Sequence, residues 1–296
     1  MFTVGLVLRL VLAPRIGFVS DLRYFQEWAA RLHDVSLRAF YVGDLSKQYP
    51  PGYLYVLALI GRISATPGYL ALKLPAIIAD LAIAWMAGAF AARIAPTPVR
   101  ERWPVRTLVA AAVLLNPAVI CLSAVWGQVD SVPTAFTLAS LLLLLTAPRG
   151  EEPAAYREIG AIVCFAIAFS IKPQSAFLFP AVAYCLFRRH VWAHRGLALA
   201  EGLARIAALG SIGLSVWVLS GVPFGLGPNG LLDFYRQASN SYEVTSVWAF
   251  NLWGVAGFWK GDVPGAEFPL MRVAGIPAFT VGMVLLKHGI FSFGET

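Results

Sequence analysis

Residues 69–92 read YLALKLPAIIADLAIAWMAGAFAA, an apolar run in which only Lys73 and Asp80 are charged. A helix needs about 20 mostly apolar residues to cross the hydrocarbon core of a bilayer. Hydrophobic residues make up 58% of the chain and charged residues 13%, whereas soluble domains average about 45–50% and about 25%. The sequence therefore predicts an all-α, polytopic transmembrane helical bundle. The other apolar runs are residues 1–14, 51–65, 107–125, 131–147, 159–187, 203–220 and 273–291.

The net charge of +7 comes from basic residues in short loops between these runs. Because Lys and Arg are enriched in cytoplasmic loops, we interpret the charge as a topology signal and expect no nucleic-acid partner. Loops 93–106, 149–157 and 188–195 should then be cytoplasmic. The turn at 126–131 must then face the other side of the membrane. The run 159–187 is too long for one span and too short for two full spans, so we expect a hairpin of short helices whose tip also faces that side.

The run 69–92 ends at the cytoplasmic loop 93–106, so it must begin on the outer side of the membrane. Residues 15–68 are therefore expected to form a first extracytoplasmic loop, provided that the short run 51–65 lies in the membrane interface. A second long extracytoplasmic segment is expected at 221–272. We treat 1–296 as a single transmembrane domain and expect it to be truncated, because apolar runs begin and end abruptly at its termini. The composition, rich in Ala and Arg, favours a bacterial plasma membrane.

The stretch SDLRYFQEWAARLHD, which begins at Ser20, predicts an amphipathic interfacial helix. Ser20 or Asp21 would be its N-cap, and Tyr24, Trp28 and Leu32 follow at helical spacing. Asp21 either caps this helix or serves as a general base at the membrane surface. The spacing alone favours the cap.

Three of the charged residues within apolar runs are candidates for a functional role. Lys73 is near the outer end of 69–92 and can snorkel to a phosphate or headgroup. Asp80 lies deeper, where a carboxylate indicates either a functional site or a polar partner on another helix. Lys172, at the tip of 159–187, needs a partner, and a lipid phosphate or bulk headgroups explain it equally well.

The sharpest polar cluster is WGQVDS, at residues 126–131. A tight turn requires residues such as Gly and Asp, but Trp126, Gln128 and Asp130 also suit sugar binding. Tyr49 precedes two prolines, a pattern that favours a helix-initiating turn with an interfacial tyrosine.

Metal and cofactor motifs are weak throughout the sequence. His190 and His194 have the spacing of zinc ligands but lie in an arginine-rich loop without a third ligand. The glycines at 225, 227 and 230 fit a dinucleotide-binding pattern without the strand that it requires. Cys121, Cys164 and Cys185 lie in apolar runs. We therefore expect no metal site and no cofactor.

Six motifs occur in an order that is familiar from a known family: DLRYFQEW (21–28), YPPGYLY (49–55), LKLPAIIADL (72–81), LNPAVICLSAVWGQVDS (115–131), SIKPQ (170–174) and VWAFNLWG (247–254). With these motifs the chain resembles the bacterial relatives of the second GPI mannosyltransferase, within the GT-C superfamily of membrane glycosyltransferases. The resemblance extends from about residue 18 to residue 260.

The resemblance implies a GT-C-like fold whose long first extracytoplasmic loop carries interfacial helices. It implies an inverting glycosyltransferase that moves a sugar, expected to be mannose, from a polyprenyl-phosphate carrier to a hydroxyl of a glycolipid or glycan acceptor. Asp21 would be the catalytic residue. Lys172, Lys73 and Arg23 would bind the donor phosphate. The residues assigned to the sugar or acceptor are Trp126, Gln128, Asp130, Tyr49 and Asn251.

Two other classes of protein fit the same chain. A transporter or lipid flippase would place polar residues near the bilayer midplane and often contains a repeat, whereas here the polar residues cluster towards one face. A non-catalytic membrane subunit that supports another enzyme is the third hypothesis. Membrane lipids are expected contacts in every case.

Overall fold

The computed structural model describes residues 1–15, 17–43, 49–146, 152–192 and 194–239. The chain divides into two units, Met1–Leu232 and Asp233–Thr296, and the described part of the second is the end of α12, where Arg236 pairs with Asp233 at 3.2 Å. The described residues form twelve α-helices: α1 Phe2–Leu12, α2 Val19–Asp34, α3 Pro51–Ile63, α4 Tyr69–Ile94, α5 Thr97–Arg102, α6 Val105–Leu114, α7 Pro117–Ile120, α8 Ser131–Leu145, α9 Glu152–Ile171, α10 Phe179–His190, α11 Gly196–Gly221 and α12 Pro228–Ser239.

Within the part of the chain that the structure describes, two helices are long and apolar enough to cross a membrane by length and composition, namely α4 and the segment Gly196–Phe224 that contains α11. A third span is present if α6 and the bent segment Pro117–Trp126 are counted together, with a 47° bend between them. The bend lies at Asn116, whose side chain accepts a hydrogen bond from Ala118 N at 2.9 Å. The prediction of an all-α, polytopic membrane protein is thus confirmed.

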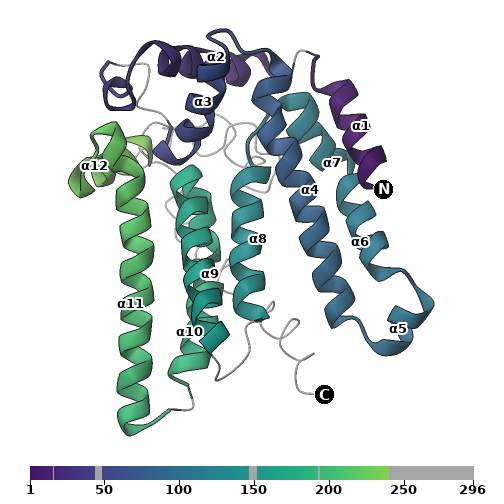
Figure 1. The fold of residues 1–296 in the computed structure, drawn as a ribbon, viewed down its shortest axis with the longest axis vertical. Helices are drawn as coiled ribbons and strands as arrows, with labels where there is room; N and C mark the ends of the chain where they lie inside the picture. The colour runs from purple at the N-terminus through teal and green to yellow at the C-terminus, as the bar shows by residue number, and fades with distance from the viewer. Residues whose placement is uncertain (16, 44–48, 147–151, 193, 240–296) are drawn as a thin grey trace, which may run out of the picture. The chain divides into compact units, whose positions relative to one another are not determined.

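Helix α4 is the centre of one half of the bundle and packs against α1, α6 and α8. In the other half, α8 packs on α9 and α9 on α11 (Figure 1). Small side chains allow these close approaches, as is usual where lipid removes the hydrophobic drive for helix association. A Cβ at Gly88 of α4 would lie 2.6 Å from the carbonyl oxygen of Arg106, so α4 and the start of α6 meet through backbone.

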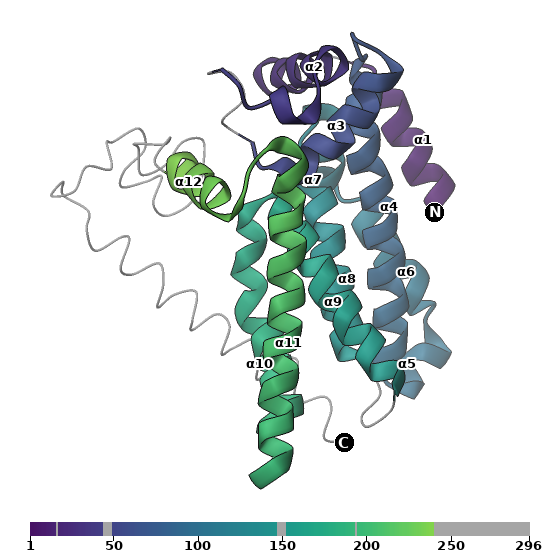
Figure 2. The same ribbon diagram turned by 60° about the vertical axis from the view of Figure 1, so that its left-hand side comes forward.

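Helices α2 and α3 lie at the end of the bundle opposite α5 (Figures 1 and 2). The predicted amphipathic helix is therefore present as α2, but its N-cap is Phe18, without a side-chain cap. Tyr24 is exposed rather than part of the buried face. The buried face packs on α3 and consists of Leu22, Phe25, Trp28, Ala29 and Leu32. At 13 residues, α3 is shorter than a span.

The break expected in the run 159–187 is confirmed, since α9 ends at Ile171 and Lys172 is extended, with φ −149° and ψ 119°. However, α9 begins at Glu152 and has 20 residues, so this helix is longer than the sequence suggested. A 3₁₀ segment, Pro173–Leu178, leads into α10. The end of α10 and the start of α11 lie at the same end of the bundle as α5 (Figure 1).

Candidate functional site

Asp21 and the tryptophan-glycine turn meet at the α2 end of the bundle. The Asp21 carboxylate accepts hydrogen bonds from Trp126 Nε1 at 3.0 Å and from Gln128 Nε2. Just before α2, Phe18 N donates to Trp126 O at 3.2 Å, and the two rings lie 5.0 Å apart. Asp21 is therefore occupied by partners in this turn, which explains why it does not cap its own helix.

The turn depends on a glycine at position 127. Gly127 has a φ of +93°, a conformation that side-chain-bearing residues rarely adopt. A Cβ there would also lie 2.6 Å from Leu22 Cδ2 and 3.1 Å from Lys73 Cε. Both the backbone angle and the close approach of α2 and α4 thus require glycine, and they fix the position of Trp126 and Gln128 on either side.

Lys73 is fully buried, although the sequence suggested that it snorkels to a phosphate. Its Nζ donates to the carbonyl oxygens of Arg15 and Val125, both at 3.0 Å. These carbonyls belong to two chain segments that lie beside the N-terminal end of α4, so the ammonium links the two segments through hydrogen bonds. Arg23, the third residue assigned to a donor phosphate, is exposed on α2.

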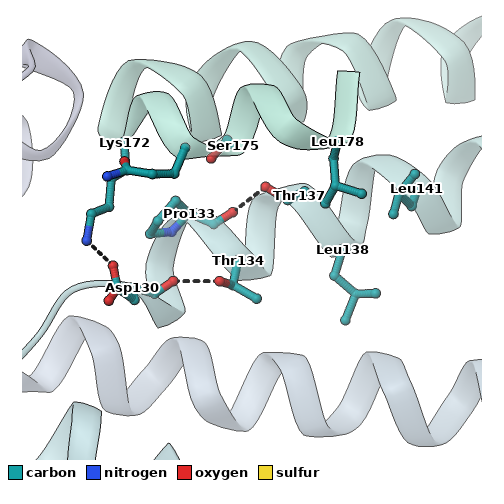
Figure 3. A pocket seen from close by; sticks show the side chains of 10 residues that line it. Asp130, Pro133, Thr134, Thr137, Leu138, Leu141, Lys172, Ser175 and Leu178 are labelled. Carbon is teal, nitrogen blue, oxygen red and sulfur yellow. Dashed lines mark hydrogen bonds and ion pairs between the residues drawn. The ribbon is translucent and has the colours of Figure 1, made fainter. Parts of the chain in front are cut away.

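Lys172 forms an ion pair with Asp130 (Figure 3). The pair is partly accessible, with side-chain exposures of 25% for Lys172 and 43% for Asp130. It lies at one end of a groove of about 380 Å³ between α8 and the segment Pro173–Leu178. Away from the pair, the groove is lined largely by apolar side chains, among them Leu138, Leu141 and Leu178.

Tyr49 packs against aromatic side chains of α2 and α3. Burial raises its pKa well above 10, and the neighbouring Tyr53, Asp130 and Asp21 raise it further in that order, so Tyr49 remains a neutral phenol. Its ring lies 5.3 Å from that of Trp28 and 6.0 Å from that of Tyr53. Of the sequence-predicted residues, Asp21 contacts Trp126 and Gln128, and Lys172 contacts Asp130 of the same turn. With Tyr49, which packs on Trp28 of α2, they make up the polar site at the α2 end.

Asp80 is fully buried and belongs to a second network deeper in the bundle. This network reaches the same turn through Ser131, whose Oγ donates to Asp80 Oδ1. Arg9 of α1 pairs with it at 2.8 Å, and Ser123 Oγ donates to it at 2.6 Å. Arg9 also donates to the carbonyl oxygens of Gly5 at 3.1 Å and Leu114 at 2.8 Å. Of the two explanations for Asp80, the polar partner on another helix is the one that the structure contains.

Sequence analysis missed a second buried carboxylate, Glu158 of α9. It is fully buried and contacts Arg189 at 3.0 Å, His190 Nε2 at 3.0 Å and Arg205 at 2.8 Å. These partners come from α10 and α11, so the cluster joins three helices. The available signal was an acid at the start of an apolar run, because such an acid needs cationic partners. His190, noted for its spacing from His194, belongs to this cluster.

Comparison with known families decides what kind of protein this is. Residues 16–238 match the family model of PIG-U, the GPI transamidase subunit PIG-U. The chain belongs to the PIG-U family. The transamidase to which the PIG-U subunit contributes attaches GPI anchors to proteins, and PIG-U is not a mannosyltransferase. No curated protein matches the chain.

The PIG-U match corrects the functional expectations drawn from the sequence. The chain belongs to the PIG-U family and not, as expected, to the relatives of the second GPI mannosyltransferase. The predictions of a polyprenyl-phosphate-dependent glycosyltransferase and of a polyprenyl-phosphate sugar donor as its partner are therefore wrong. The catalytic role predicted for Asp21 belonged to sugar transfer and is therefore not retained. The error has a physical cause: apolar spans with polar outer turns are imposed by the bilayer, and a fold does not specify a reaction. Asn251 lies outside the described residues.

Proposed function

We propose that this chain is a non-catalytic membrane subunit of a GPI-transamidase-type complex and that it holds the glycolipid substrate. The family match carries the proposal, because residues 16–238 include every segment that builds the polar site. Among the sequence hypotheses, the supporting membrane subunit agrees with this family. The partners of the chain are then the other subunits of the complex and the glycolipid and protein substrates.

The groove beside Lys172 has the chemistry that a glycolipid requires. A glycolipid anchor has apolar chains joined through a phosphate to a polar glycan. Lys172 at the mouth can pair with the phosphate, and the apolar wall that includes Leu138 and Leu141 can accept the chains. Asp21 accepts only from the neutral donors of Trp126 and Gln128 in the described contacts, so its carboxylate can also accept hydrogen bonds from glycan hydroxyls.

The proposal includes the topology of the chain within a single transmembrane domain, 1–296. Residues 15–68 form a first loop with α2 and α3 as interfacial helices, in a GT-C-like arrangement. The second long segment predicted at 221–272 lies outside the described residues beyond position 239. The glycolipid site then lies on the non-cytoplasmic side, which in a bacterial plasma membrane is the extracytoplasmic side. The arginine-rich segments at the opposite end support this orientation.

The proposal predicts that Asp21→Asn lowers glycolipid handling without loss of assembly. A charge-assisted hydrogen bond contributes about 1.5–3 kcal/mol, so attachment should fall about tenfold or more. The complex would be purified from native membranes through the tagged full-length chain and given a labelled GPI glycolipid and a reporter protein. Attachment of the glycolipid to the reporter is the measurement.

Asp34→Asn is the matched control, because Asp34 lies on the same helix and is exposed away from the site. It should attach the glycolipid at the wild-type rate. The wild-type preparation should also transfer no mannose from polyprenyl-phosphate mannose. If Asp21→Asn and Asp34→Asn attach the glycolipid equally well, Asp21 is not part of the glycolipid site. Transfer of mannose by the wild-type preparation would contradict the proposed function itself.

A further inference from the structure

A second pocket lies at the end of the bundle opposite the glycolipid site, between the end of α10 and the first turns of α11. It has a volume of about 450 Å³. Figure 1 shows that these helices meet at the same end as α5. His190 and His194 line one wall, and Glu201 and Arg205 of α11 line the other. The proposed function uses none of these residues.

The electrostatics of this pocket favour an anion. The lining itself has one cation, Arg205, and one anion, Glu201, and the chain segments that form the pocket also carry Arg188, Arg189 and Arg195. Glu158 is already satisfied by its three basic partners. In addition, the pocket opens at the N-terminal turns of α11, a 26-residue helix, where the helix dipole favours negative charge.

Two donors remain available towards the pocket. Arg205 uses Nε for its bond to Glu158, and a guanidinium has further donors at its two Nη atoms. His194 Nδ1 is buried and has no hydrogen-bond partner among the described residues. Arg205 keeps 41% of its side chain exposed, so the guanidinium can reach a ligand without leaving Glu158.

Two large apolar side chains close to the pocket residues in the chain are exposed. Trp192 is 64% exposed and lies two residues from both His190 and His194, and Leu197 is 84% exposed and directly precedes Ala198 of the lining. Tryptophan at this position is typical of a membrane–water interface. An anion bound here is therefore expected to be attached to lipid rather than dissolved in bulk water.

We propose that this pocket binds the phosphate group of an anionic lipid headgroup, with Arg205 and His194 as donors. Basic pockets between helices on the cytoplasmic side are suited to such headgroups. The site is separate from the glycolipid groove and lies on the other side of the membrane. Bound lipid would link α10 to α11 next to the Glu158 cluster.

The test is native mass spectrometry of the full-length protein, titrated in detergent with short-chain phosphatidylglycerol or phosphatidylcholine. Phosphatidylglycerol should bind at least about tenfold more tightly, and Arg205→Gln and His194→Gln should each weaken it about fivefold to tenfold. His194→Gln leaves the Glu158 cluster intact, so it reports on binding even if Arg205→Gln unfolds the protein. Glu201→Gln removes a repelling charge and should tighten binding.

The control is Arg102→Gln, which removes an exposed arginine on α5, outside the pocket. It should bind phosphatidylglycerol like the wild type. Equal affinity for the two lipids, or equal losses in Arg102→Gln and His194→Gln, would overturn the site. If glycerol phosphate binds as tightly as phosphatidylglycerol, the pocket binds phosphate but is not a lipid site, and the proposal is wrong.

Discussion

Arg9→Met should lower the free energy of unfolding by about 3–5 kcal/mol, because it leaves a buried carboxylate without its cation. Arg9 and Asp80 are both fully buried, with Nε 2.8 Å from Oδ2. The substitution also removes donors from the carbonyls of Gly5 and Leu114. Unfolding in mixed micelles, followed by fluorescence, measures the change.

Two further variants make this result specific. Arg23→Met removes an exposed arginine from α2 and should change the unfolding free energy by less than about 0.5 kcal/mol. Arg9→Met combined with Asp80→Asn should be less destabilised than Arg9→Met alone, because the uncompensated charge is gone. An Arg9→Met protein as stable as the wild type would show that the pair does not hold α1 to α4.

Glu158→Gln should be nearly as damaging, with a loss of about 3 kcal/mol. The change keeps the shape of the side chain but removes the negative charge that pairs with Arg189 at 3.0 Å and Arg205 at 2.8 Å. Because those groups come from α10 and α11, their repulsion should loosen both helices from α9. The readouts are the unfolding free energy and the rate at which Cys185 of α10 reacts with a maleimide, which should rise.

Glu101→Gln is the matched control for this cluster, since Glu101 is exposed on α5 and forms none of the Glu158 ion pairs. It should leave both readouts at the wild-type values. If Glu158→Gln behaves like this control, the cluster is not a structural tie between the three helices.

The sequence predicts those helices, helix breaks and turns that are determined by residues close together in the chain. The apolar run around Pro75 becomes α4, and Asn116 and Lys172 mark helix breaks, because proline follows each of them. The residues of WGQVDS form a turn around Gly127. Each of these features depends on neighbours in the chain, and a single sequence contains that information.

Long-range partners could not be predicted in the same way. Arg9 and Asp80 are 71 residues apart, and no periodicity connects them. Lys73 can either snorkel or donate inward, and only the positions of the Arg15 and Val125 carbonyls decide between the two. The polar site posed a similar problem, because Asp21 with a neighbouring Trp and Gln suits a catalytic base as well as a binding group. Family membership, rather than residue type, separates these functions.

The glycolipid site is tested most directly by photo-cross-linking in the purified complex. A photoreactive amino acid would replace Leu138 in the groove or, as a control, the exposed Leu214 of α11, with a radiolabelled GPI glycolipid as ligand. We expect labelling at position 138 about tenfold above position 214, competed by unlabelled glycolipid but not by phosphatidylcholine, and lost with Lys172→Gln. Equal labelling at the two positions, unchanged by Lys172→Gln, would contradict a glycolipid site in this groove.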